Sequence, residues 1–248
     1  MAMNPMEQFA IKPIVPLHIG GYDVSFTNQS LLMVLVALAA SLFLTLAMSK
    51  RSLVPSRTQS MAEMSYEFVA NMMQSSTGED GLRFFPFVFT IFVFVLFSNF
   101  FGMIPGSFTV TSQIAVTFSL ASLVILTVIV TGFVKHGFGF LKLFVPKAPW
   151  YLLILLVPIE VISFLTRPIS LSVRLFANML AGHTMLAVFG GFVVLLGGAG
   201  GVLSLLSIAP MALIVAIMLL ELLVAFLQAY VFAILTCIYL NDAIHPGH

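Results

Sequence analysis

A single arginine, Arg174, lies in an apolar half of this chain that carries almost no charge. Residues 175–220 contain no Asp, Glu, Lys or Arg, and residues 148–173 contain only Glu160 and Arg167. An arginine side chain keeps its proton in proteins, so Arg174 cannot act as a proton carrier. In a membrane such a charge costs about 2.5–3.5 kcal/mol on insertion scales. A permanent cation is useful there if it holds an opposing carboxylate in its ionised form, which is the chemistry we expect of Arg174.

Several other polar residues would share one helical face with Arg174. Each residue of a helix turns by about 100°, and this places the following side chains within about 40° of Arg174: Glu160, Arg167, Ser170 and Asn178. His183 falls near the opposite face by the same count. Glu160 is a poor partner for Arg174, because the two residues would lie about 21 Å apart along one helix.

The last apolar segment carries a second polar face, formed by Glu221, Gln228 and Tyr239. If this segment runs antiparallel to the one before it, Glu221 and His183 could meet between the two helices. A carboxylate and a histidine, which titrates near neutrality, are suited to passing a proton. Ionisable groups inside membrane segments usually face a protein partner or water and usually have a function.

Each of these residues also has a purely structural interpretation. Arg174 could pair with Glu221, and His183 could donate to a backbone carbonyl. Asn178 and Gln228 could join helices through hydrogen bonds worth about 0.6 kcal/mol each. For Arg167, beside Pro168, we favour a side chain that reaches the interface or binds lipid. We interpret Cys237 as part of the hydrophobic core, and the aromatic run at 84–101 as bulky side chains that face lipid.

The composition is that of a membrane protein. The 248 residues are 60% hydrophobic and 8% charged, against about 25% charged residues in soluble domains. The net charge of +1 gives no sign of nucleic-acid binding, and the one cysteine excludes an internal disulfide or a multi-cysteine metal site. We expect no metal and no cofactor. The polar N-terminus lacks the features of a signal peptide, so the first apolar run is expected to stay as an anchor.

These observations predict an all-α integral membrane protein with about five membrane helices in a single domain. Clean spans cover 30–49, 84–104 and 113–134, after an external segment at 1–29. Residues 57–76 are expected to form either an interfacial amphipathic helix or an ordinary packed helix. The two remaining segments, 150–196 and 202–241, meet at the turn sequence GGAGG and are too long for ordinary spans. They must therefore be broken or strongly tilted.

The distribution of lysine and arginine predicts one orientation. Basic residues lie between the first two spans and after the third, whereas the loop PGSFTVTS carries no charge. The positive-inside rule then places the N-terminus outside and the C-terminus in the cytoplasm. The basic residues used are Lys50, Arg51, Arg57, Arg83, Lys135, Lys142 and Lys147.

Two motif blocks resemble a known family. The stretch RPISLSVRLFANMLAGH, with ELLVAFLQAYVFAILTCIYLNDA downstream and NPMEQF near the start, is similar to subunit a of the F-type ATP synthase, over essentially the whole chain. The resemblance matches Arg174 to the essential arginine that faces the carboxylates of the rotor, and Asn178, Gln228 and Glu160 to polar positions of the family. Many bacterial members carry the acid and the histidine of positions 183 and 221 in the opposite order. The arrangement here is similar to that of alphaproteobacterial and mitochondrial members.

The resemblance implies a stator subunit that is not catalytic alone and provides two offset proton half-channels. Its expected partners are protons, the lipid bilayer, a rotor ring of small two-helix subunits that each carry a carboxylate, and the membrane subunits of the peripheral stalk. It implies a bacterial inner membrane, with the mitochondrial inner membrane as the alternative, and long tilted last helices that lie along the rotor. The chain has no GxxxxGK[ST] phosphate loop with which to make ATP itself.

Two other functions stay open on the residues alone. A proton-coupled secondary transporter is expected to show repeated halves with matching helix breaks, but Pro158 and Pro168 have no counterpart in the other half. A purely structural membrane subunit would leave Arg174, His183 and Glu221 without a role.

Overall fold

The computed structural model describes residues 11–16, 18–19, 22–23, 25–49, 54–104, 109–145 and 149–245. Within these ranges five helices are long and apolar enough to cross a membrane, which confirms the predicted all-α membrane fold. Parts of the basic pattern used for orientation lie outside the described residues, namely Lys50, Arg51 and Lys147, as does the segment 1–10.

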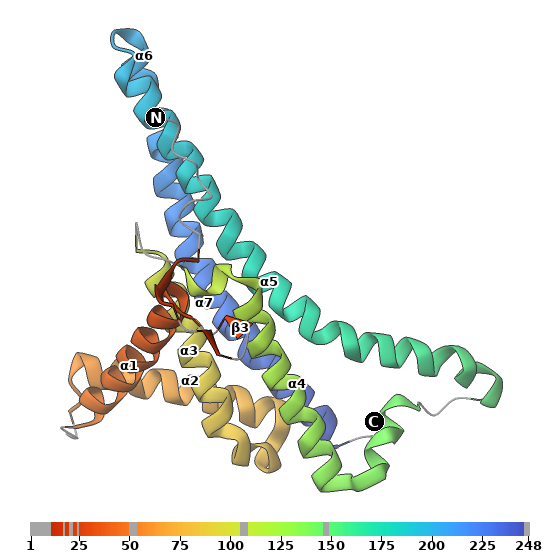
Figure 1. The fold of residues 1–248 in the computed structure, drawn as a ribbon. Helices are drawn as coiled ribbons and strands as arrows, with labels where there is room; N and C mark the ends of the chain where they lie inside the picture. Colours follow the sequence, from red (N-terminus) through yellow and green to blue (C-terminus); the bar gives the residue numbers. More distant parts are fainter. Residues whose placement is uncertain are drawn as a thin grey trace.

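The first part of the chain forms a compact helical bundle (Figure 1). It contains α1 (Asn28–Ser49), α2 (Arg57–Gly81), α3 (Phe85–Gly102) and α4 (Ile114–His136). Short 3-10 turns extend or join these helices, η2 (Leu82–Phe84), η3 (Val110–Ser112) and η4 (Gly137–Phe144). The Ser56 hydroxyl caps α2 by accepting from the Gln59 backbone N–H at 3.3 Å. Gly137, at φ 55°, ends α4 with a backbone conformation that other residues rarely adopt.

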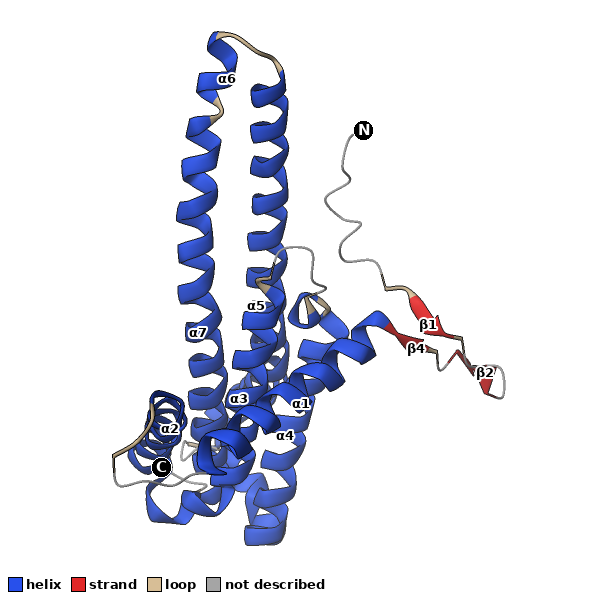
Figure 2. Ribbon diagram, turned by 90° about the vertical axis from the view of Figure 1, so that its left-hand side faces the viewer, coloured by secondary structure: helices blue, strands red, loops and turns tan. Residues whose placement is uncertain are grey.

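Short strands precede α1, which the sequence did not lead us to expect. Strand β1 (Pro13–Val15) pairs antiparallel with β4 (Phe26–Thr27), and β2 (His18–Ile19) pairs antiparallel with β3 (Tyr22–Asp23). They form a small nested hairpin beside the start of α1 (Figure 2). The Asn28 side chain joins this hairpin to the helix by accepting from the Lys12 backbone N–H at 3.1 Å.

A long helical hairpin makes up the second part of the chain. Helix α5 (Trp150–Gly198) and helix α7 (Ile208–Ile244) lie side by side and extend beyond the bundle, joined through the short helix α6 (Val202–Leu206) (Figure 2). Gly200 and Gly201 form the turn with φ of 71° and 63°. The 49 residues of α5 correspond to about 70 Å, more than twice a bilayer core. The helix continues through Pro158 and Pro168 and bends along its length instead of breaking (Figure 1).

The core lies where α7 crosses the bundle. Val69 and Met73 of α2, Phe92 of α3, Val124 of α4 and Phe232 of α7 are fully buried there. Cys237 is also fully buried, as predicted. The prediction that the aromatic run at 84–101 is lipid-facing bulk was wrong. Phe92 is buried, and several of its neighbours pack against the same core, among them Phe84, Phe85, Phe87, Phe89 and Phe97.

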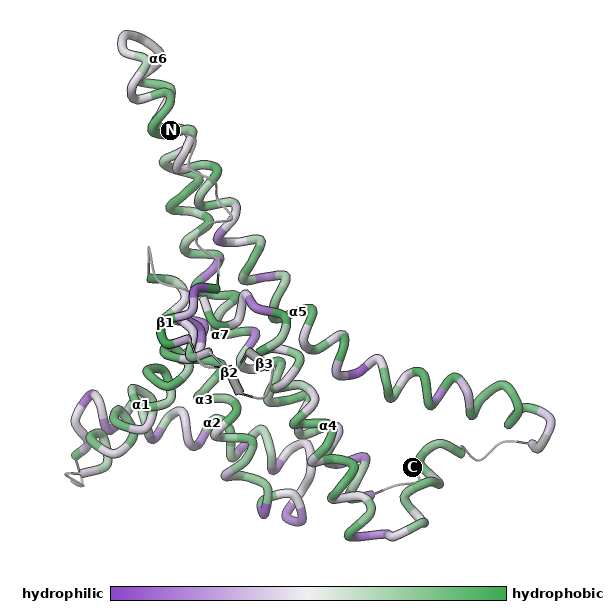
Figure 3. The backbone as a smooth tube through the Cα atoms, in the orientation of Figure 1, coloured by the Kyte–Doolittle hydropathy of each residue, from purple (hydrophilic) through white to green (hydrophobic). Residues whose placement is uncertain are grey.

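Helix α5 leaves most of its apolar surface uncovered by the rest of the chain. Side chains such as Ile154 and Val194 are about three-quarters exposed, at 75% and 73%. The colouring by hydropathy shows α5 and α7 as largely apolar, with a few hydrophilic turns (Figure 3). Exposed apolar surface of this extent requires lipid or another protein to cover it.

Candidate functional site

Arg174 lies on an exposed side of α5, with Ser170 and Asn178 one turn before and after it. The adjacent side of the same helix is buried by Leu171, Leu175 and Met179. Among the described residues, Arg174 makes no hydrogen bond and no ion pair, so the alternative pairing with Glu221 is absent from the structure. The guanidinium is thus presented outward from an apolar helix.

His183 and Glu221 meet between α5 and α7. The His183 Nε2 atom lies 3.6 Å from Glu221 Oε1, and the side chains are only 11% and 4% exposed. The same His183 nitrogen lies 3.0 Å from the Thr109 hydroxyl. Glu221 Oε1 has no hydrogen-bond partner among the described residues. The structure therefore brings the acid and the histidine together in a buried site, where a carboxylate needs a partner or a water.

Gly182 makes room for this pair. A Cβ atom at position 182 would lie 2.5 Å from Glu221 Oε1 and 3.0 Å from its carboxyl carbon. The absent side chain allows the carboxylate of α7 to pack directly against the α5 backbone. The AGH sequence at 181–183 therefore supplies both the histidine and the space for the acid.

Two separate sets of hydrogen bonds involve hydroxyl and amide groups of the bundle, and the first includes Thr109 beside His183. The Thr109 hydroxyl donates to the Gly102 carbonyl at 3.4 Å. The Thr111 hydroxyl donates to Asn99 Oδ1 at 2.9 Å. The Asn99 amide donates to the Ala225 carbonyl at 3.1 Å. Sequence reasoning missed these residues, because hydroxyls in an uncharged loop and one amide in an aromatic span carry no periodic signal.

Arg167 is paired with the C-terminal end of α7, and its reach to the interface or to lipid stays a prediction. Its Nη1 atom lies 2.8 Å from Asp242 Oδ2. Its guanidinium also lies 4.9 Å from the ring centre of Tyr239 and 5.5 Å from that of Phe164. Pairing with a carboxylate on the neighbouring helix stabilises this charge more than exposure to hydrocarbon would. The same contacts place Tyr239 beside Arg167, away from the His183–Glu221 pair.

The remaining predicted residues lie apart from this pair. Glu160 and Gln228 are half-buried, while Asn178 and Ser170 are exposed. Among the described residues, neither Gln228 nor Asn178 makes a hydrogen bond, so neither joins helices within this chain in the way that we considered. Their amide groups stay available to whatever covers this surface.

The geometry thus combines two elements of proton chemistry. A buried histidine and carboxylate, with a neighbouring hydroxyl, can accept and release protons. An exposed arginine can hold an external carboxylate in its ionised form. The first element lies inside the chain, and the second faces away from it.

Comparison with known proteins adds an independent finding. The family described as ATP synthase A chain matches residues 30–241. The chain is 62% identical over 247 residues to the ATP synthase subunit a of Mesorhizobium japonicum, covering 99% of this chain and 98% of the relative. It is 63% identical over 249 residues to that of a Chelativorans species, covering 100% of each. It is 61% identical over 248 residues to the ATP synthase subunit a of Rhizobium rhizogenes, covering 100% of this chain and 99% of the relative.

Proposed function

This chain belongs to the ATP synthase A chain family, and we propose that it is the stator that couples proton flow to rotation of a rotor ring. As a family member it is a non-catalytic, multi-pass subunit of the membrane sector.

The single observation that carries the proposal is the exposed position of Arg174. Hydrocarbon cannot solvate this cation, and no described carboxylate of the chain neutralises it. In the proposal, a carboxylate from outside the chain does so. A rotor ring of small two-helix subunits, each with a carboxylate at mid-membrane depth, supplies such a group and covers the apolar surface of α5. Each carboxylate would ionise opposite Arg174 as it passes.

The proposed orientation has the N-terminus outside and the C-terminus in the cytoplasm. The loop before α4 is then external, and Thr109 in this loop lies 3.0 Å from His183. The His183–Glu221 pair would therefore belong to the outer half-channel. Glu160 is near the start of α5, which would be its cytoplasmic end, so it would belong to the inner half-channel.

In this mechanism a proton reaches the rotor carboxylate by way of Glu221 and His183. The neutral acid travels through lipid around the ring and releases its proton to the inner half-channel near Glu160. Arg174 stabilises the ionised carboxylate between the two half-channels and prevents a direct proton leak. Asn178, Ser170 and Gln228 would supply hydrogen bonds around the arginine, and Tyr239 would support Arg167. Each proton that crosses 100 mV supplies about 2.3 kcal/mol.

We propose the bacterial inner membrane as the location, with the membrane subunits of a peripheral stalk holding the chain against the rotor. A secondary transporter would need no ring, and a purely structural subunit would need no cation at an exposed position. Co-purification separates these functions. The intact complex should contain a ring of two-helix subunits, and a chain that purifies without one would contradict the proposal.

Cross-linking tests which face of α5 meets the rotor. Asn178→Cys is exposed and should form a disulfide with a cysteine placed near the rotor carboxylate. Met179→Cys is the matched control, because the adjacent residue is fully buried within the chain. Equal cross-linking of both variants, or of neither, would contradict the proposed rotor face.

A further inference from the structure

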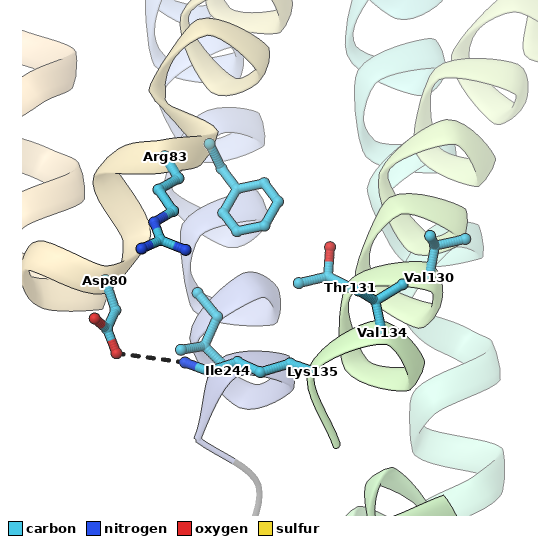
Figure 4. Close-up of a pocket in the computed structure, with 8 residues that line it drawn as sticks. Asp80, Arg83, Val130, Thr131, Val134, Lys135 and Ile244 are labelled. Carbon is cyan, nitrogen blue, oxygen red and sulfur yellow. Dashed lines mark hydrogen bonds and ion pairs between the residues drawn. The ribbon is translucent and has the colours of Figure 1, made fainter. Parts of the chain in front are cut away.

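A cavity of about 600 Å³ lies at the opposite end of the bundle from the His183–Glu221 pair. It is formed where η2, α4 and the end of α7 come together (Figure 4). Its lining joins charged and apolar side chains: Asp80, Arg83, Phe84, Val130, Thr131, Val134, Lys135 and Ile244. No residue of this cavity takes part in the proposed proton path.

The cavity lies at the boundary of the membrane. Arg83 comes just before the apolar helix α3, and Lys135 lies in the last turn of the apolar helix α4. The end of α7 is tied to this place by His136, whose Nε2 atom lies 2.9 Å from the Ile244 carbonyl oxygen. The polar ends of these three chain segments thus lie at the same level. Their apolar turns extend from there into the bilayer.

The charges in this cavity favour an anion. Lys135 Nζ lies 3.3 Å from Asp80 Oδ2, and His245 Nε2 lies 3.7 Å from the same oxygen, so the one carboxylate is already engaged. Arg83 makes no hydrogen bond and no ion pair with the described residues, and Figure 4 shows its guanidinium directed into the space beside Ile244. A guanidinium can bind two phosphate oxygens at once.

The remaining walls suit a hydrocarbon chain. Phe84, Val130, Val134 and Ile244 line the cavity, and Val134 is 83% exposed toward the surroundings of the bundle. Thr131 adds a hydroxyl to the lining. Basic pockets between membrane helices on the cytoplasmic side are a recurring means of binding anionic lipid headgroups.

We infer that this cavity binds one anionic phospholipid, with its phosphate on Arg83 and its acyl chain along Val130 and Val134. The assignment of the cavity to the cytoplasmic leaflet rests on the orientation in the proposed function. The binding itself does not depend on proton translocation, so its test is separate from that of Arg174. A free phosphate ion shares the headgroup chemistry but would not use the apolar walls.

The test uses the intact ATP synthase complex reconstituted in nanodiscs of phosphatidylcholine and phosphatidylglycerol. After release into detergent, native mass spectrometry counts the phosphatidylglycerol molecules that each complex retains. Arg83→Gln removes the cation, and Val134→Trp fills the apolar side while it keeps both cations. Arg57→Gln is the matched control, because Arg57 is an exposed arginine at the other end of α2.

We expect Arg83→Gln and Val134→Trp each to retain less phosphatidylglycerol than wild type, with affinity lowered about fivefold for the lost cation. Arg57→Gln should retain as much as wild type. Inorganic phosphate should not displace the lipid, whereas a short-chain phosphatidylglycerol should. The inference is overturned if Val134→Trp and Arg83→Gln retain the wild-type amount, or if Arg57→Gln loses as much as they do. Displacement by inorganic phosphate alone would show an ion site instead.

Discussion

His183 of α5 and Glu221 of α7 face each other across the long hairpin, with Nε2 of the histidine 3.6 Å from Oε1 of the acid. Both side chains are almost fully enclosed, and the Thr109 hydroxyl lies on the same nitrogen at 3.0 Å. Because the pair spans two helices, its chemistry depends on having one acid and one histidine and less on which helix carries which.

Exchange of the two residues should recover proton flux that either single change removes. His183→Glu alone places two acids at about 3–4 Å, roughly the spacing at which like charges cannot both ionise. Glu221→His alone leaves two histidines without an acid. The double variant His183→Glu/Glu221→His restores one of each. Passive and ATP-driven proton flux in inverted membrane vesicles measures the effect for all three variants.

The quantity to compare is the interaction free energy between His183 and Glu221, which the two single variants and the double variant give together. Interaction energies between contacting residues are typically about 0.5–3 kcal/mol, or about 2- to 150-fold in flux. If the double variant shows only the sum of the two single losses, the residues act independently, and the relay pair is wrong.

Gly182→Ala should reduce proton flux without preventing assembly. The new Cβ would lie 2.5 Å from Glu221 Oε1, which must move away and lengthen its distance to His183. A carboxylate at the end of a flexible side chain can move, so the fold should tolerate the change. We expect about a fivefold lower flux, or about 1 kcal/mol in the barrier, because the proton must cross a longer gap between the acid and the histidine.

Gly190→Ala serves as the control for this helix. Apart from the local backbone of α5, no atom lies within 4 Å of the position that its new methyl group would take, so this variant should behave like wild type. Equal fluxes in the Gly182 and Gly190 variants would show that the packing of Glu221 against α5 has no role in conduction.

Thr109→Val should lower flux because it keeps the shape of the side chain and removes the hydroxyl beside His183. A hydrogen bond of this kind contributes about 0.5–1.5 kcal/mol, which corresponds to about a two- to tenfold effect. Thr127→Val is the matched control, since the Thr127 hydroxyl bonds only its own helix at the Leu123 carbonyl. The measurement is proton flux per assembled complex, and a Thr109→Val flux equal to that of the control would remove Thr109 from the path.

Gln228→Leu should lower pumping and ATP synthesis but leave measurable activity. The amide makes no hydrogen bond with the described residues of the chain, so it can bond to Arg174 or to the rotor carboxylate when the complex is assembled. A hydrogen bond to a charged group is worth about 1–3 kcal/mol, less than the charge itself. The alternative is that Gln228 only joins helices, and then activity and assembled protein would fall together. An unchanged activity per assembled complex would exclude Gln228 from the site.

The sequence predicts the features that depend on local pattern. The membrane helices follow from long apolar runs, and the shared face of Ser170, Arg174 and Asn178 follows from helical periodicity. The approach of His183 to Glu221 could be expected only because GGAGG at 197–201 joins two antiparallel helices. In contrast, the Arg167–Asp242 pair depends on the register between α5 and α7, which no local pattern fixes.

Other features depend on packing between distant segments. Phe92 looks the same in sequence as a lipid-facing phenylalanine, but it is buried by packing against Phe68 of α2 and Phe226 of α7. Asn99 and Thr111 become a network because α3 and the turn before α4 meet beside Ala225. The nested hairpin at 13–27 consists of strands too short to produce an alternating pattern.

The proposed role of Arg174 is tested most directly by ATP-driven proton pumping in inverted vesicles that contain Arg174→Ala complexes. The proposal predicts that pumping is abolished while the complex still assembles, because no permanent cation then faces the rotor carboxylate. Arg174→Lys should restore little, since a lysine is a point charge that can lose its proton when desolvated. Arg57→Ala, an exposed arginine away from this face, should pump like wild type. Normal coupled pumping by assembled Arg174→Ala complexes would contradict the mechanism.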